Sequence, residues 1–222
     1  GFAQKLSFFM LELAGGNLWL LLVVAAVACL AFGLGLPTSA SYILVALMGA
    51  PALVKLGVPL IAAHFFVFFF ANFSAITPPV AVCCLVAAKI AEGNFFQTSF
   101  IAVRLGLPGF VLPFLFVAHP EILGIGASLP YAAMVSAMAL LGVVALNIML
   151  EGFLLRPLRL TERLVLLPAA LGLLHPSLWA SVAGITIFAG LLGWQWTTRL
   201  RLRQAGAGGH DSSDSESARR GS

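Results

Sequence analysis

Two short stretches place helix-breaking residues and small hydroxyl side chains in the most apolar part of the chain. They read GLGLPTS at residues 33–39 and ITPPV at residues 76–80, and no charged residue lies close to either. Glycine and proline both disfavour a continuous helix, so each stretch predicts an interruption between two helical segments. An interrupted helix leaves carbonyl oxygens unpaired where one segment ends and N–H groups unpaired where the next begins.

The chemistry that these interruptions support is the binding of a small cation. Carbonyl and hydroxyl oxygens can replace the water around Na⁺, which is a hard ion and needs no formal carboxylate. The absence of acidic residues near both stretches disfavours a carboxylate proton relay. The oxygens that we expect to contribute belong to Gly33, Gly35, Thr38, Ser39 and Thr77.

A purely structural interpretation of these polar residues stays open beside the first one. Two consecutive prolines, Pro78 and Pro79, also make a packing kink, in which the hydroxyl of Thr77 bonds back to its own helix. The side chains of Asn72 and Ser74, with that of Ser39, are candidates for lining a substrate cavity. The same polar groups can instead hydrogen-bond a neighbouring helix.

Motifs for catalysis or for a resident cofactor are missing from the sequence. It contains no Gly-x-Ser-x-Gly elbow, no His-Glu-x-x-His pair and no phosphate loop ending in Gly-Lys. The cysteines Cys29, Cys83 and Cys84 lie in apolar segments, without the paired spacing of a metal site. We therefore expect a protein that is not an enzyme and has no cofactor, with Na⁺ or H⁺ only as a coupling ion.

The composition excludes an ordinary water-facing surface. The chain of 222 residues is 61% hydrophobic and 9% charged, whereas soluble domains carry about 25% charged residues. Lys55 is the one charged residue between Leu13 and Ala88, so this part of the chain must lie in a bilayer or inside membrane protein. These features predict an all-α, polytopic membrane protein.

The spacing of the breaks predicts which elements hold them. Residues 18–50 are expected to form a re-entrant helical hairpin with its tip at GLGLPTS, although a single kinked helix over the same residues is the alternative. Residues 60–90 are expected to form a broken transmembrane helix, with half-helices ending near Ile76 and starting near Val80.

The remaining apolar runs predict further crossings. Residues 95–100 are interpreted as an interfacial turn that leads into a span at 101–117, and residues 119–196 as additional C-terminal transmembrane segments. The polar stretch 197–222 mixes acids with bases, which favours a disordered cytoplasmic tail over a nucleic-acid-binding arm.

Basic residues orient these segments in the membrane. With the C-terminus in the cytoplasm, ten of the twelve lysines and arginines fall on the inner side, and Lys5 and Lys55 fall outside. The hairpin then opens toward the exterior of an inner (plasma) membrane.

The two breaks and the residues between them carry a family resemblance. The stretch GLGLPTSASYILVALMGAPALVKLGVPLIAAHFFVFFFANFSAITPPVAVC resembles the large membrane subunit of the TRAP (tripartite ATP-independent periplasmic) transporters. The resemblance extends over about residues 15–118. The segment LEGFLLRPLRLTERLVLLPAALGLL further resembles the C-terminal part of fused permeases, which usually work with binding proteins of the TAXI type.

The resemblance implies a fold, a function and a set of site residues. It implies an elevator-type importer of organic acids, typically carboxylates, that is coupled to Na⁺ or sometimes H⁺ and is fed by a periplasmic substrate-binding protein. Residues 1–118 would be the C-terminal half of its transport domain, and the matching upstream half would precede Gly1. The sodium site would lie between the hairpin tip and the broken helix; the residues carried over are Gly33, Gly35, Pro37, Thr38, Thr77, Pro78, Pro79 and Val80.

Two other functions remain alternatives at this stage. One is a hairpin-type carboxylate symporter that needs no binding protein, and the other is a membrane scaffold subunit that does not transport. Whichever holds, the lipid bilayer is an expected partner and nucleic acid is not. The resemblance also leads us to expect that residues 1–222 do not transport on their own.

Overall fold

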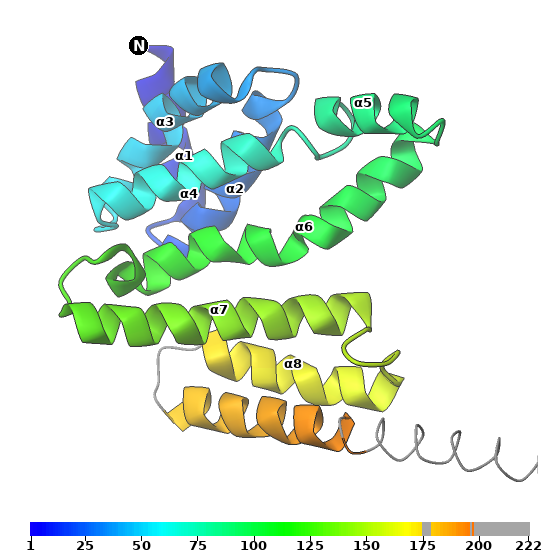
Figure 1. The fold of residues 1–222 in the computed structure, drawn as a ribbon. Helices are drawn as coiled ribbons and strands as arrows, with labels where there is room; N and C mark the ends of the chain where they lie inside the picture. The colour runs from blue at the N-terminus through cyan, green and yellow to red at the C-terminus, as the bar shows by residue number, and fades with distance from the viewer. Residues whose placement is uncertain (175–178, 196, 198–222) are drawn as a thin grey trace, which may run out of the picture.

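The computed structural model describes residues 1–174, 179–195 and 197, and in these residues the secondary structure is helical apart from a one-residue bridge between Phe153 and Pro157. Figure 1 shows α1–α4 packed together, α6 leading away from them, and the later helices stacked beyond it. The helices are α1 (Phe2–Ala14), α2 (Leu18–Gly33), α3 (Thr38–Lys55), α4 (Leu60–Phe73), α5 (Val82–Ile90), α6 (Phe95–Ala118), the short 3₁₀ helix η1 (Pro120–Leu123), α7 (Leu129–Glu151), α8 (Leu160–Leu174) and Trp179–Gln195.

The main apolar core lies among α1, α2, α3 and α4. Leu21, Val45, Leu53 and Phe66 are fully buried there, and small residues such as Ala63 let the helices approach closely. Because α2, α3 and α4 are all packed on one another, the ends of these helices are held in fixed positions. Those ends are the places where the sequence predicts its two interruptions.

Within the described residues, three helices are long and apolar enough to cross a membrane, namely α3, α6 and α7. The helix α2, the helix α4 and Trp179–Gln195 are apolar but shorter. The prediction of an all-helical membrane protein is confirmed at this level. The helical segment predicted to follow GLGLPTS and to end at Ala50 was too short, because α3 continues through Pro51 to Lys55. Burial of Ala52 and Leu53 compensates for the backbone hydrogen bond that this proline removes.

The prediction of an interfacial turn at residues 95–100 was wrong. These residues are the first turns of α6, which begins at Phe95 and continues without a break to Ala118. The side chain of Asn94 accepts a hydrogen bond from the Gln97 N–H at 3.1 Å, and this cap satisfies a backbone group that would otherwise be unpaired.

The helices α7, α8 and Trp179–Gln195 pack closely against each other. A Cβ atom at Gly172 would lie 2.7 Å from the carbonyl oxygen of Ala180, and one at Gly184 would lie 2.7 Å from that of Ala169. Such backbone contact between helices needs residues without side chains. The described part of residues 119–196 thus consists of η1, α7, α8 and the helix Trp179–Gln195 with their connecting loops, whereas the predicted tail beyond Thr197 lies outside the described residues.

Candidate functional site

The two interruptions meet in space. The helix α2 ends at Gly33 and α3 begins at Thr38, while α4 ends at Phe73 and α5 begins at Val82. The Ser74 hydroxyl, in the second interruption, donates to the Gly33 carbonyl oxygen, in the first, across 3.0 Å. Figure 1 shows the loop between α2 and α3 beside the loop between α4 and α5.

The tips of the two links also lie close together. Gly35 has a φ of +77°, a left-handed conformation that favours glycine, and its missing Cβ would lie 3.5 Å from a methyl group of Val80. The carbonyl oxygen of Gly35 accepts no hydrogen bond within the described part of the chain. The first link therefore presents an open backbone oxygen next to the second.

A buried polar junction lies behind these tips. Ser41 and Ser74 are both buried, and a Cβ at Gly33 would lie only 2.6 Å from the hydroxyl oxygen of either. The two hydroxyl oxygens also lie near the carbonyl oxygen of Ala71, Ser41 at 3.4 Å and Ser74 at 2.6 Å. Only glycine fits at position 33, since any side chain there would displace these two hydroxyl groups.

Backbone hydrogen bonds between the residues before and after Pro78 and Pro79 stabilise the second interruption. The Thr77 carbonyl oxygen accepts from the Ala81 N–H at 3.2 Å, and the Ala75 carbonyl oxygen accepts from the Cys83 N–H at 3.1 Å. The Thr77 hydroxyl donates to the Phe73 carbonyl oxygen at 2.8 Å, which is the bond expected from the packing-kink interpretation. This bond uses the hydroxyl hydrogen and leaves the oxygen lone pairs of Thr77 able to face a cation.

Helix ends of opposite sign come together at this place. The N-termini of α3 and α5 have no side-chain cap, so their first N–H groups carry partial positive charge. The C-termini of α2 and α4 end at the same links and carry partial negative charge. The arrangement can bind a cation at the carbonyl ends and an anionic group at the N–H ends.

The predicted site residues differ in how accessible they are. Gly33 and Ser74 are buried, and the half-buried residues are Asn72, Thr77 and Pro78. The Asn72 amide donates to the Phe68 carbonyl oxygen of its own helix at 2.7 Å. The exposed members of the set, which lie on the two links or in the first turn of α3, are Gly35, Pro37, Thr38, Ser39, Pro79 and Val80.

Sequence reasoning missed Ser41 and the contact between Tyr42 and His64. Tyr42 and His64 are hydrogen-bonded at 2.9 Å between α3 and α4, and they line apolar cavities of about 320 Å³ and about 560 Å³. The position of Ser41 one turn after Thr38 is a signal that the sequence offers, because residues three apart share a helix face. For Tyr42 and His64, 22 positions apart, the sequence alone offers no such signal.

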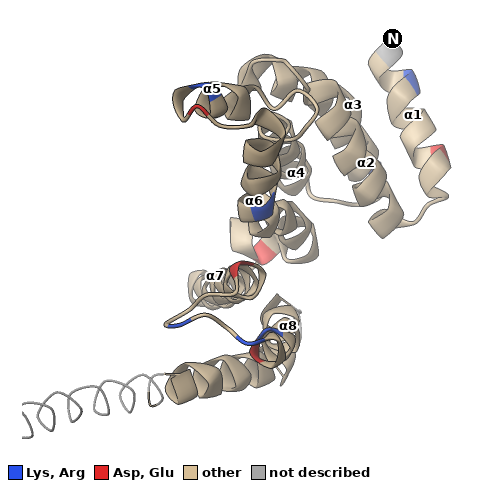
Figure 2. Cartoon of the chain, turned by 90° about the vertical axis from the view of Figure 1, so that its right-hand side faces the viewer, with Lys and Arg blue, Asp and Glu red and all other residues tan. Residues whose placement is uncertain are grey.

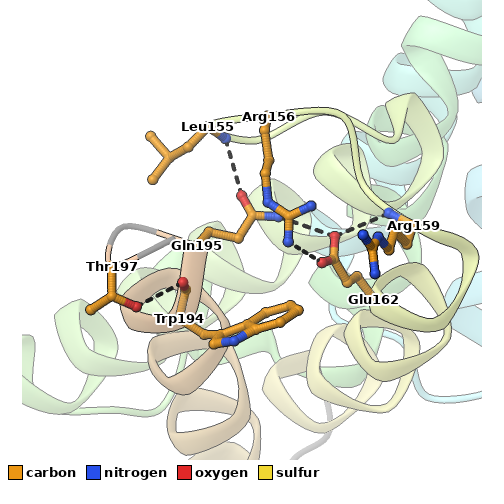
Figure 3. Close-up of polar contacts among 7 residues, drawn as sticks. All are labelled: Leu155, Arg156, Arg159, Glu162, Trp194, Gln195 and Thr197. Carbon is orange, nitrogen blue, oxygen red and sulfur yellow. Dashed lines mark hydrogen bonds and ion pairs between the residues drawn. The ribbon is translucent and has the colours of Figure 1, made fainter. Parts of the chain in front are cut away.

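A separate polar cluster joins the α7–α8 loop to the last described helix. Figure 3 shows Glu162 at its centre, 2.5 Å from the Arg156 guanidinium, 3.0 Å from the Arg159 backbone nitrogen and 3.3 Å from the Gln195 amide nitrogen. The Gln195 amide oxygen in turn accepts from the Leu155 N–H at 3.3 Å. Glu162 and Gln195 are buried, so this cluster fixes the loop against the end of Trp179–Gln195.

Arg104 ties α6 to the same end of α7. Its guanidinium donates to the Leu150 carbonyl oxygen at 3.1 Å and lies 3.6 Å from a Glu151 carboxylate oxygen. In Figure 2 the charged residues of α6, α7, α8 and the intervening loop are gathered in this region. A guanidinium at a helix C-terminus satisfies carbonyl groups that have no partner within the helix.

In the described residues, two helix interruptions meet within an all-helical membrane chain, an arrangement that is typical of membrane transport proteins with discontinuous helices. The chain belongs, within this class, to the family described as tripartite ATP-independent periplasmic transporter, DctM component, whose family model matches residues 1–132. No curated protein and no solved structure matches the chain.

Family membership confirms the coarser part of the sequence predictions. The protein is a permease component of a TRAP transporter and not an enzyme, and its family implies a periplasmic binding protein as partner. The match ends at residue 132, shortly after α7 begins at Leu129. Most of α7, all of α8 and the helix Trp179–Gln195 therefore lie beyond it.

Proposed function

We propose that the protein imports organic acids, typically carboxylates, and that this import is driven by a Na⁺ gradient, with H⁺ as the alternative coupling ion. The observation that carries this proposal is the contact between the two interruptions through the hydrogen bond from Ser74 to Gly33, with Gly35 lying close to Val80. Unpaired backbone groups at membrane depth are costly unless they are satisfied by protein, water or a ligand.

The coupling cation is proposed to bind between the two links. Its ligands would be the carbonyl oxygens of Gly33, Gly35 and Val80 with the hydroxyl oxygens of Thr38 and Thr77. The Gly33 carbonyl oxygen already accepts from the Ser74 hydroxyl at 3.0 Å and from the Leu36 N–H at 3.3 Å, so the cation would take the place of the longer of these two hydrogen bonds. The proposed ligands are all neutral oxygen donors, which suit a hard monovalent ion.

The substrate carboxylate is proposed to bind at the start of α3. The first N–H groups of this helix are uncapped, and Thr38 and Ser39 add exposed hydroxyl donors beside them. A helix N-terminus attracts anions through its free donors and its dipole. Asn72, on α4, is the further candidate for contact with the rest of the substrate.

The proposal extends to partners, motion and orientation. We propose a TAXI-type binding protein, an upstream half of the same permease, and an elevator-like movement of α2–α5 as one body. We also propose that the C-terminus is cytoplasmic. This orientation is supported by the gathering of Arg104, Arg156 and Arg159 near one end of α7, because short basic loops stay on the inner side.

The test compares two matched threonine variants in the complete transporter supplied with its binding protein. Thr77→Ala should abolish the Na⁺-dependent uptake of radiolabelled carboxylates while the amount of protein in the membrane is unchanged. Thr186→Ala is the control, because its hydroxyl also bonds back to its own helix, at 2.8 Å, but lies away from the interruptions. Equal sodium dependence in both variants would refute the site.

A second measurement uses sodium alone as the probe. Adding NaCl should raise the Tm of the purified protein more than adding choline chloride does, because an ion that binds only the folded state stabilises that state. Gly33→Leu should remove this increase, since its side chain would displace Ser41 and Ser74. No sodium-specific stabilisation of the wild-type protein would count against Na⁺ and leave H⁺ as the coupling ion.

A further inference from the structure

The helix α6 carries a notch that receives the residue at which α4 ends. A Cβ atom at Gly109 would lie 2.6 Å from Cζ of Phe73, so the aromatic ring occupies the space of the missing side chain. The ring of Phe73 also stacks on that of Phe110, with centroids 4.2 Å apart and an interplanar angle of 17°. Gly109 and Phe110 thus enclose the ring from two directions.

A second glycine of α6 receives the interruption itself. Gly106 lies three residues before Gly109, so both face the same side of the helix. A Cβ at Gly106 would lie 3.1 Å from Cδ1 of Ile76, which belongs to the link between α4 and α5. α6 is therefore contacted by Phe73, at the end of α4, and by Ile76, within the link.

Phe73 connects the contact with α6 to the candidate ion site. Thr77 donates its hydroxyl hydrogen to the Phe73 carbonyl oxygen, so the position of Phe73 sets where the oxygen of Thr77 lies. Ser74, the next residue after Phe73, makes the hydrogen bond to Gly33. A displacement of the Phe73 ring that carries its backbone along would consequently shift the Thr77 hydroxyl and the Ser74 hydroxyl that bonds to Gly33.

We infer that Phe73 and Gly109 are positioning residues for the coupling-ion site, with the α6 notch of Gly106, Gly109 and Phe110 as the seat that fixes the second interruption. This inference rests on the proposed cation site between the two links. The seat is rigid on the α6 side, because Pro108 is buried and fixes its own backbone next to Gly109. The Phe73 ring is constrained on the other side by Phe69, at a centroid distance of 6.2 Å.

The experiment fills the notch with a methyl group at position 109 and then removes the resulting clash by shortening the side chain at position 73. Gly109→Ala adds a methyl group in the space that the Phe73 ring occupies, so the ring must move. The variant should raise the Na⁺ concentration for half-maximal uptake by roughly five- to tenfold, with a smaller change in maximal uptake. The double variant Phe73→Leu/Gly109→Ala should restore a value near that of the wild type, because leucine lacks the ring atom that clashes. Gly190→Ala is the matched control, since a Cβ there meets nothing within 4 Å.

A second readout follows the link without any transport. Cys83 is exposed next to the interruption, whereas Cys29 and Cys84 are buried, so alkylation by N-ethylmaleimide reports on the start of α5. Gly109→Ala should change the rate of Cys83 alkylation in the purified protein, measured by mass spectrometry, and the double variant should reverse the change.

Each outcome decides one of the two proposals. A Gly109→Ala protein that is less stable but keeps the wild-type sodium dependence and alkylation rate would overturn the inference and reduce the notch to packing. A wild-type transporter without sodium dependence would refute the proposed cation site alone. The alkylation rates of the single and double variants would then still decide whether the notch positions the link.

Discussion

Ser74 is the residue at which the two interruptions become one structure. Its buried hydroxyl lies 3.0 Å from the Gly33 carbonyl oxygen and 2.6 Å from that of Ala71, and so joins the end of α2 to the end of α4. The sequence suggested Ser74 as part of a substrate cavity, and that role stays a prediction. What the structure adds is the bridge, which depends on the helices packing in three dimensions.

The contribution of this bridge can be measured with a matched serine. Ser74→Ala should lower the stability of the purified protein by about 1 kcal/mol, or roughly 2–4 °C in Tm, because an interhelical hydrogen bond is lost in a buried place. Ser136→Ala should have little effect, since that hydroxyl bonds only to Ala132 of its own helix, at 2.7 Å. Thermal unfolding in detergent measures both, and equal losses would contradict the bridge.

At the residue scale, glycines and prolines were predictable and buried serines were not. Backbone breaks follow from the chemistry of glycine and proline themselves, whatever their neighbours are, as at Gly33, Gly35, Pro78 and Pro79. Ser41 looks like any other small polar residue in an apolar helix, and only the approach of Ala71 and Gly33 gives it a partner.

Whole helices were predicted better than the positions of their ends. The sequence indicated separate helical segments over most of the chain, but it started α6 at residue 101 and ended the arm after GLGLPTS at residue 50. In both places helix-breaking residues are outweighed by other interactions. A cap at Asn94 and burial around Pro51 extended the helices instead.

The cluster around Glu162 gives a prediction that belongs to the helices it joins. Glu162→Gln should cost about 2 kcal/mol of stability, because it leaves the Arg156 guanidinium largely buried without its carboxylate. Glu151→Gln is the matched control and should change stability by about 1 kcal/mol or less, since its pair with Arg104 is long and more exposed.

Thermal unfolding of both glutamine variants, with protease cleavage near the C-terminal end, makes the comparison. The Glu162→Gln protein should be cleaved faster beyond Gln195, because the last helix has lost its polar contact with the loop. An effect of Glu151→Gln as large as that of Glu162→Gln would show that burial of the cluster contributes nothing.

For the whole molecule, the sequence predicts more about residues 1–132, which the family model matches, than about the helices that follow them. The family model covers residues 1–132, which include both interruptions and the α6 notch. The close packing of α7, α8 and Trp179–Gln195 follows from glycines such as Gly172 and Gly184, whose partners lie on other helices. Composition predicts that such helices are apolar, but it does not say which ones meet.

The last prediction concerns what the permease needs in order to work. Membership of the DctM family implies that a soluble partner captures the substrate and delivers it to the membrane. At a substrate concentration well below saturation, removing the binding protein from proteoliposomes that hold the complete transporter should lower uptake by roughly tenfold or more, because delivery then depends on free substrate alone.

The same proteoliposomes distinguish this dependence from loss of the ion site. Without the binding protein, NaCl should still stabilise the purified permease against heat, since the proposed cation ligands are all in this chain. Adding the binding protein back should restore uptake in the wild type and in Thr186→Ala, but not in Thr77→Ala, whose defect lies inside the permease. Uptake that is equally fast with and without the binding protein would instead favour a carboxylate symporter that works alone, and it would do so without weakening the case for the cation site.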